Sequence, residues 1–371
     1  MSDVGWKSVS DVPAPLWIES DETLAMAMQD VGPVAAIDTE FQRTDTFFPL
    51  AGLYQICSGD KVWLLDPLAI KDFSPFVRVL EDPAITKIMH ACMEDLELLW
   101  HCLGTHPRNI FDTQLAYAYV STRYSIGLVG LIGTELGIAL QQSHTRSDWL
   151  RRPLSSGQLH YAAEDVWYLP ALYQRLVSRL EETGRLSWFV EDMKLHGVYE
   201  PEDPEVYFQS VHRAWSLEAP ALGRLQGLCA WRERAAREVN IPRRRVVPDE
   251  GLFELARRNQ ISPRDLEDVM NPGTARRFGA EIIRVHTQSS PVVEPLELPL
   301  TPGEGKRIKR LREVAVTQAE RLKLAPELIA RKRDLEGLFR HWREVGALSP
   351  VYSGWRREAV GEHLLAELGP A

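Results

Sequence analysis

Two carboxylates follow a short apolar segment near the N-terminus. Residues 34–37 are all apolar, and Asp38 and Glu40 come directly after them, two positions apart. An apolar run of this kind predicts a buried strand, and side chains two apart in a strand lie on the same face. Two like charges on one face are costly unless a cation binds them, and carboxylate oxygens suit Mg²⁺ or Mn²⁺. The pair alone is equally typical of a strand end exposed to solvent.

Two later stretches carry acidic groups that could join this pair. Asp95 lies where residues 90–97 enter a predicted helix, a position at which an acidic residue also stabilises the helix N-terminus. Tyr161 and Asp165 are four residues apart in a predicted helix and therefore share one face. A tyrosine hydroxyl beside a carboxylate can orient a water that a metal ion has acidified. The other interpretation is a tyrosine packed in the core with its hydroxyl on a carboxylate.

The order of the predicted strands and helices places these groups in one α/β domain. Two short runs, 52–58 and 62–68, follow the first strand and are separated by a Ser-Gly-Asp turn signal, which predicts a meander. Further strands are predicted at 85–91 and 109–112. The predicted helices are 73–81, 94–103, 113–120, 126–137, 155–183 and 185–195. Strands interleaved with helices after a meander predict a mixed sheet covered by helices.

Proline-rich segments divide the chain into several predicted domains. Pro201 and Pro204 end the α/β part, which we predict as residues 1–203. Residues 206–290 have helical patterns throughout, and the proline-containing segment 291–304 predicts an extended linker. The last predicted domain is a second helical part, residues 305–371.

The charge is distributed unevenly along the chain, although the net charge is −9. Residues 1–205 hold 15 basic and 30 acidic residues, whereas residues 206–290 hold 14 and 10, and residues 300–345 hold 12 and 7. Basic parts appended to an acidic domain favour a polyanionic partner, with ordinary surface variation as the alternative.

Several classes of protein are disfavoured by the sequence. No apolar run approaches the roughly 20 residues of a membrane span, and the first residues lack a signal-peptide pattern, so we expect a cytoplasmic protein without a membrane partner. The four cysteines are scattered and predict reduced thiols. Residues 303–306 are not a phosphate-binding loop, because Leu300 occupies the first glycine position of that motif, and no zinc spacing or serine-hydrolase elbow is present.

The candidate residues, taken in chain order, resemble the tyrosine-bearing subclass of the DEDD superfamily of 3′→5′ exonucleases. The matching positions are Asp38, Glu40, Asp95, Tyr161 and Asp165. The chain is more closely similar to the bacterial ribonuclease D family, with matches at residues 38–41, 111–114 and 147–154. In the wider superfamily an Asn often precedes the aspartate of the second motif. Here the matching region carries His90 instead, which is similar to the ribonuclease D branch.

The helical parts resemble HRDC domains, the nucleic-acid-binding module of this family and of RecQ helicases. Residues 231–233, 236–237 and 247–250 match the module in the first helical part. Residues 354–356 support a second, more diverged copy. The resemblance implies a ribonuclease H-like α/β fold, a mixed five-stranded sheet with flanking helices, followed by two all-α HRDC-like domains.

The resemblance also implies a catalytic site. The implied ligands of two divalent ions, Mg²⁺ or Mn²⁺, are Asp38, Glu40, Asp95 and Asp165. Tyr161 is expected to position the attacking water, and Phe41 to stack on the terminal base. Thr39 and His90 complete the expected substrate contacts.

The implied activity is that of a 3′→5′ exoribonuclease. Its expected substrates are the 3′ ends of tRNA precursors and other structured RNAs, its products are nucleoside 5′-monophosphates, and it needs no nucleotide cofactor. We expect the chain to act as a monomer. The alternatives are a DNA 3′→5′ exonuclease of the same superfamily and a non-catalytic RNA-binding scaffold.

Overall fold

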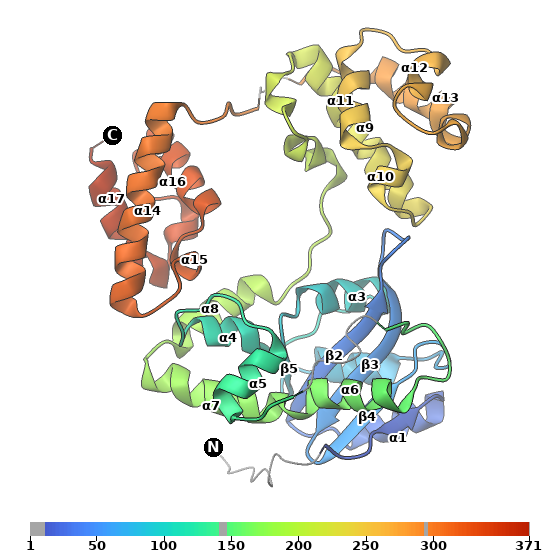
Figure 1. The fold of residues 1–371 in the computed structure, drawn as a ribbon, viewed down its shortest axis with the longest axis vertical. Coiled ribbons are helices and arrows are strands. Elements are labelled where there is room, and N and C mark those ends of the chain that lie inside the picture. Colours follow the sequence, from blue (N-terminus) through green and yellow to red (C-terminus); the bar gives the residue numbers. More distant parts are fainter. Residues whose placement is uncertain (1–11, 141–146, 293–295, 371) are drawn as a thin grey trace. The chain divides into compact units, whose positions relative to one another are not determined.

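The computed structural model describes residues 12–140, 147–292 and 296–370 (Figure 1). These residues form two compact units, each described separately below. Of the described residues, 12–42, 51–140, 147–199 and 302–370 form the first unit, and 43–50, 200–292 and 296–301 form the second.

A mixed sheet forms the centre of the first unit (Figure 1). Within the described residues it has six strands in the order β1-β4-β3-β2-β5-β6. The strands are β1 (Leu16–Ile18), β2 (Val34–Gln42), β3 (Leu50–Ser58), β4 (Lys61–Leu65), β5 (Thr86–Met89) and β6 (Ile110–Asp112). β3 and β4 are antiparallel, as the meander predicts, whereas β2, β5 and β6 run parallel to one another. The mixed α/β class is therefore confirmed.

The predicted number of five strands is wrong by one. The additional strand is β1, which pairs in parallel with β4 through the register Leu16↔Trp63 to Ile18↔Leu65. Because β1 has only three residues and lies at the edge of the sheet, its sequence is too short to show a two-residue period.

Helices flank the sheet in the N-terminal part of the first unit. The C-terminal part of this unit has only helices and short turns among its described residues. The helices of the unit are α1 (Asp21–Gln29), α2 (Ser74–Glu81), α3 (Met93–Leu103), α4 (Thr113–Ala118), α5 (Leu128–Leu136), α6 (Ser156–Trp167), α7 (Leu169–Glu182), α8 (Leu186–His196), α14 (Pro302–Leu322), α15 (Pro326–Ile329), α16 (Lys332–Val345) and α17 (Glu362–Leu368), with short turns η3 (Pro350–Tyr352) and η4 (Arg357–Gly361). The single helix predicted over 155–183 is two helices that meet at Tyr168. Pro170 lies in the first turn of α7 and has no N–H to continue the bonding of α6.

The central strand β2 is buried where it precedes the candidate carboxylates. Ala35, Ala36 and Ile37 are fully buried, and Val34 to Ala36 pair with β5. Burial on both sides explains the continuous apolar run, because neither face of this part of the strand meets solvent. The strand therefore delivers Asp38 and Glu40 from a rigid, paired segment.

The second unit is helical. Its elements are η1 (Pro204–Ser210), η2 (Ala214–Ser216), α9 (Ala219–Glu238), α10 (Arg243–Val246), α11 (Asp249–Arg257), α12 (Pro263–Glu267) and α13 (Pro272–Gln288). Leucines on α9 form its core together with Ile282 of α13. Residues 43–50, which connect β2 to β3, also pack here: the backbone N–H groups of Phe47 and Phe48 donate to Oδ1 of Asn240 at 3.0 and 2.9 Å.

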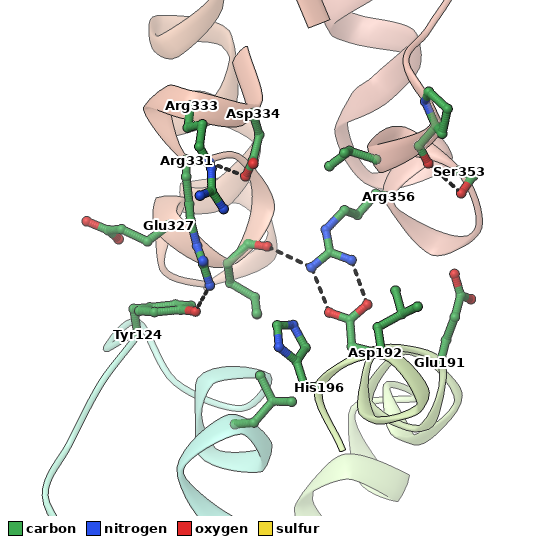
Figure 2. Close-up of a pocket in the computed structure, with 15 residues that line it drawn as sticks. Tyr124, Glu191, Asp192, His196, Glu327, Arg331, Arg333, Asp334, Ser353 and Arg356 are labelled. Carbon is green, nitrogen blue, oxygen red and sulfur yellow. Dashed lines mark hydrogen bonds and ion pairs between the residues drawn. The ribbon is translucent and has the colours of Figure 1, made fainter. Parts of the chain in front are cut away.

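The C-terminal helices of the first unit contact α8 through a buried carboxylate (Figure 2). Asp192 accepts two hydrogen bonds from the guanidinium of Arg356, both at 2.6 Å, and one from the indole of Trp355 at 3.2 Å. The hydroxyl of Tyr119 also donates to Asp192. The bonds from Arg356 hold the pKa of Asp192 below its usual value despite its burial.

We predict that Arg356→Ala lowers the free energy of unfolding by about 3 kcal/mol, because it leaves the charge of Asp192 buried without its main partner. Urea denaturation, monitored by tryptophan fluorescence, measures the change in the free energy of unfolding. Arg357→Ala is the matched control, since its ion pair with Glu362 is exposed and is worth less than about 1 kcal/mol. Equal effects of the two substitutions would contradict the prediction.

Candidate active site

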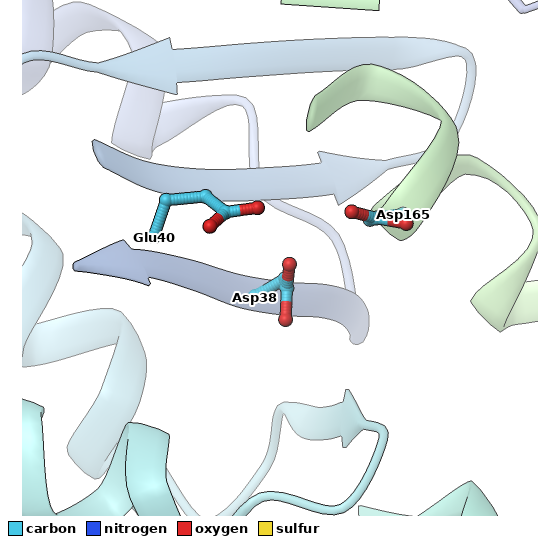
Figure 3. A group of neighbouring side chains, drawn as sticks. All are labelled: Asp38, Glu40 and Asp165. Carbon is cyan, nitrogen blue, oxygen red and sulfur yellow. The ribbon is translucent and has the colours of Figure 1, made fainter. Parts of the chain in front are cut away.

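Three carboxylates from two elements meet at the end of the buried part of β2 (Figure 3). Asp38 and Glu40 extend from β2, and Asp165 extends from α6. One carboxylate oxygen of each residue lies within 4.8 Å of those of the other two. In Figure 3 the carboxylates of Glu40 and Asp165 point toward each other, with Asp38 beside them. Glu40 and Asp165 are 125 positions apart in the chain, and the structure brings their carboxylates together.

These carboxylates are destabilised as anions. Burial raises the pKa of Asp38 to about 7. Burial, followed by the charges of Asp38 and Asp165, raises the pKa of Glu40 to about 10. The pKa of Asp165 is also well above its usual value, because the group is buried and faces Asp38. Oxygen donors held together against their own repulsion fit a divalent cation, which would neutralise them.

Asp95 lies beside this group rather than within it. It is on the first turn of α3 and is only 7% exposed. The Thr39 hydroxyl donates to one of its carboxylate oxygens at 2.5 Å. Burial first, and then the charge of Asp38, raises the pKa of Asp95. The structure thus places the fourth predicted ligand close enough to feel the other charges, but its carboxylate is engaged by Thr39.

Tyr161 lies one helical turn before Asp165 on α6 and donates its hydroxyl to that carboxylate. This matches the shared face predicted from their spacing. Burial and the charge of Asp165 raise the pKa of the tyrosine, so its hydroxyl stays protonated and acts as a hydrogen-bond donor. Its ring packs against Trp149, with centroids 6.1 Å apart.

The remaining predicted substrate contacts lie in different surroundings. Phe41 continues β2 and is partly buried against the core of the first unit. His90 is held at both ring nitrogens: Nδ1 lies 2.9 Å from Oγ1 of Thr113, and Nε2 lies 3.0 Å from the carbonyl of Ile126. Burial lowers the pKa of His90. The neutral ring therefore connects β5 to the segment before α5, and its contact with substrate stays a prediction.

Sequence reasoning assigned no role to Asp112. Its carboxylate accepts hydrogen bonds from the backbone N–H groups of Ala91 and Cys92, at 3.1 and 3.0 Å. It also caps α4 by accepting from Gln114 and Leu115. Asp112 thereby fixes the turn that starts α3, the helix of Asp95. An Asp directly before a helix is a capping signal, but the second connection could not be read from local spacing.

We predict that the metal-free protein loses thermal stability as the pH rises from 5 to 8. Folding raises the carboxyl pKa values from about 4 in the unfolded chain to about 7 for Asp38 and about 10 for Glu40. The folded state therefore binds more protons than the unfolded state in this range, and its stability falls with pH. Added Mg²⁺ or Mn²⁺ should raise the melting temperature, and more strongly at pH 8 than at pH 5.

Differential scanning calorimetry in EDTA and in each metal measures this effect. Asp165→Asn is expected to flatten the pH dependence in EDTA, because it removes one of the facing charges. A melting temperature at pH 8 that does not respond to either metal would contradict the prediction.

Known proteins resemble this chain over almost its whole length. Residues 15–181 match the family model for a 3′-5′ exonuclease, and residues 221–285 match that for the HRDC domain. Ribonuclease D of Pseudomonas paraeruginosa is 39% identical, over 97% of this chain and 99% of the relative. The corresponding Escherichia coli protein is 34% identical over 94% and 96%. The chain belongs to the ribonuclease D family.

The fold agrees with this assignment. The crystal structure of Escherichia coli RNase D matches with a TM-score of 0.88 and 33% identity, covering 96% of this chain and 100% of that one. The resemblance to ribonuclease D and the presence of an HRDC domain are confirmed. As a member of the ribonuclease D family, the chain is a 3′→5′ exoribonuclease, and its substrate is RNA.

None of the helices in the described part of the chain is long and apolar enough to cross a membrane. The predicted monomeric state and cytoplasmic location stay predictions.

Proposed function

We propose that this ribonuclease D family member trims the 3′ ends of tRNA precursors and other structured RNAs and releases nucleoside 5′-monophosphates. The observation that carries the hydrolytic part is the carboxylate group of Asp38, Glu40 and Asp165, whose oxygens lie within 4.8 Å of one another. The choice of structured RNA is supported by the matching Escherichia coli structure, described as an exoribonuclease involved in structured RNA processing.

In this proposal the carboxylates bind two divalent ions, Mg²⁺ or Mn²⁺. The ligands are Asp38, Glu40, Asp95 and Asp165. Bound ions of this kind acidify water and neutralise charge on a phosphodiester. The protein's part is to hold the oxygens at the end of β2 and to orient the attacking water through the hydroxyl of Tyr161. The hydroxyl stays protonated, since its pKa is raised by burial and by Asp165. With its proton on Asp165, its oxygen can accept a hydrogen bond from the water.

Contacts with the RNA end are assigned to residues next to these ligands. Phe41, one residue after Glu40 in β2, would stack on the terminal base, a contact that tolerates any sequence. Thr39 would act mainly through its hydrogen bond to Asp95. His90 would shape the site through Thr113 and Ile126.

The helical parts would hold the body of the RNA. We assign residues 1–203 to the exonuclease domain, 206–290 and 305–371 to two HRDC-like domains, and 291–304 to the linker. On α14 the exposed side chains of Lys306, Lys309 and Arg312 recur every three residues, a spacing that places them along one side of the helix.

We predict that replacing Lys306, Lys309 and Arg312 together by Gln weakens binding to tRNA-like RNA. All three side chains are exposed, so they can contact phosphates. Each lost phosphate contact reduces the slope of log affinity against log salt by about 0.7–0.9. Fluorescence anisotropy at several salt concentrations measures both quantities.

The control for this variant removes two charges outside the helical parts that already have partners. It combines Lys61→Gln and Arg175→Gln, two exposed side chains of the exonuclease domain that pair with Asp30 and Glu135. We expect a smaller loss of affinity and an almost unchanged slope. Equal slopes for the parent and the α14 variant would exclude α14 from the RNA-binding surface.

The proposed reaction is tested with tRNA-like RNA labelled at the 3′ or the 5′ end. With Mg²⁺ or Mn²⁺ present, a label on the 3′ nucleotide should be released as mononucleotide by the first cleavage. A label at the 5′ end should remain on progressively shorter RNA. EDTA should stop both changes. A matched DNA 3′ tail should be degraded more slowly; equal degradation of both tails would favour the DNA exonuclease alternative.

A further inference from the structure

A partly buried ion pair forms at the end of β4. Nε and Nη2 of Arg152 donate to the two carboxylate oxygens of Asp66, at 2.9 and 2.6 Å. Asp66 directly follows β4 and is only 4% exposed. Because a guanidinium is planar, two parallel hydrogen bonds fix its orientation as well as its position.

The same guanidinium ties three segments of the first unit together. Nη2 also donates to the carbonyl of Gly52 on β3 at 2.7 Å. Nη1 donates to the carbonyls of Trp149 and Arg151, both at 2.9 Å. Arg152 therefore attaches the main chain on either side of Leu150 to the sheet, just before α6 begins at Ser156.

The attachment brings Trp149 against the strands of the active site. A side chain at Gly52 would place its Cβ 2.6 Å from Cβ of Trp149 and 3.1 Å from the carbonyl oxygen of Glu40, so only glycine allows this approach. Trp149 is 2% exposed, and its indole N–H has no hydrogen-bond partner among the described residues. Its position therefore depends on packing and on the main chain that Arg152 holds.

The indole of Trp149 in turn packs against Tyr161. The two ring centroids are 6.1 Å apart, and the Tyr161 hydroxyl donates to Asp165. We propose that the Asp66–Arg152 pair positions Tyr161, by fixing the main chain of Trp149 and so the ring surface against which the tyrosine packs. This inference rests on the function proposed above, in which Tyr161 orients the attacking water.

The expected consequence is kinetic. Displacement of a reacting group by about 1 Å can cost about 100-fold in rate, so we expect Arg152→Ala to lower kcat by about 10- to 100-fold with little change in KM for RNA. The affinity for Mn²⁺ should change little, because Arg152 contacts none of the three grouped carboxylates. Arg152→Lys should restore little of the rate, since an ammonium keeps the charge but lacks the planar fork.

A double-mutant cycle with Tyr161→Phe separates a positioning role from a merely structural one. If Arg152 acts through the Tyr161 hydroxyl, Arg152→Ala should lower kcat in the parent but have almost no further effect in Tyr161→Phe. Single-turnover assays of the full chain, run below the melting temperature of each variant, measure the four rates. Lys61→Ala is the control. Lys61 lies on β4, the strand that Asp66 follows, and its substitution removes only an exposed ion pair with Asp30, so kcat should be unchanged.

The outcomes distinguish this inference from the proposed function. Equal fold-losses from Arg152→Ala in both backgrounds would overturn the positioning role and leave the proposed function intact. A parental kcat in Tyr161→Phe would instead overturn the assigned role of the tyrosine, and the inference with it. If Arg152→Ala does not fold, Trp149→Leu tests the same connection with the ion pair intact and is expected to show the same lack of additivity.

Discussion

Asp38→Asn is expected to lower kcat for RNA hydrolysis by about 1,000-fold or more. Metal ions stabilise a phosphoryl transition state by several kcal/mol, and each 1.4 kcal/mol corresponds to about tenfold in rate. Asp38 contributes an oxygen to the carboxylate group and is the charge common to the raised pKa values of Glu40, Asp95 and Asp165. An amide of the same shape removes that charge while the fold is kept. Release of labelled mononucleotide under single-turnover conditions measures the loss.

The control for this prediction is Asp30→Asn, which neutralises an exposed carboxylate paired with Lys61. Its rate should equal that of the parent. Asp38→Asn is also expected to be at least as stable as the parent in EDTA, because it removes a buried charge from a group of like charges. An Asp38→Asn protein that trims RNA as fast as the parent would show that the site is misplaced.

Tyr161→Phe is expected to lower kcat by about 100-fold or more, the usual contribution of a positioned proton-transfer or water-orienting group. The substitution removes only the hydroxyl that donates to Asp165 and leaves the ring against Trp149. The affinity for Mn²⁺ and KM for RNA should change little, because the carboxylates remain. Single-turnover rates and calorimetric titration with Mn²⁺ measure the two effects separately.

Tyr173→Phe provides the comparison for this hydroxyl. Tyr173 lies on α7, where its ring packs against Phe111 with centroids 4.7 Å apart. The substitution removes the same group, a tyrosine hydroxyl, at a different place in the fold. It should retain the parental rate. If both tyrosine variants are equally active, Tyr161 does not orient the attacking water.

Local spacing was sufficient to predict part of the site. The two-residue period of β2 places Asp38 and Glu40 on one face, and the four-residue spacing on α6 places Tyr161 beside Asp165. These features depend on the geometry of one element, which the sequence determines directly. The position of Asp95 was expected only from the resemblance, and its hydrogen bond to Thr39 joins two elements that no local pattern connects.

Apart from the grouping of the carboxylates, which the resemblance implied, contacts between distant segments were not predicted. Asp66 and Arg152 are 86 residues apart, and neither belongs to a periodic pattern that indicates the other. The same holds for Asp192 and Arg356, which are 164 residues apart. Two local errors have simpler causes: β1 is too short to show a period, and Pro170 breaks the helix between α6 and α7 although the apolar pattern continues across it.

The central claim is that Asp38, Glu40, Asp95 and Asp165 jointly bind divalent ions. Anomalous diffraction from crystals of the full chain soaked in Mn²⁺ tests it most directly, because the scattering locates the metal without reference to activity. We predict two manganese peaks in contact with carboxylate oxygens of these residues, and the loss of at least one in crystals of Asp165→Asn. Manganese found only elsewhere on a protein that remains active in the same Mn²⁺ concentration would contradict the account.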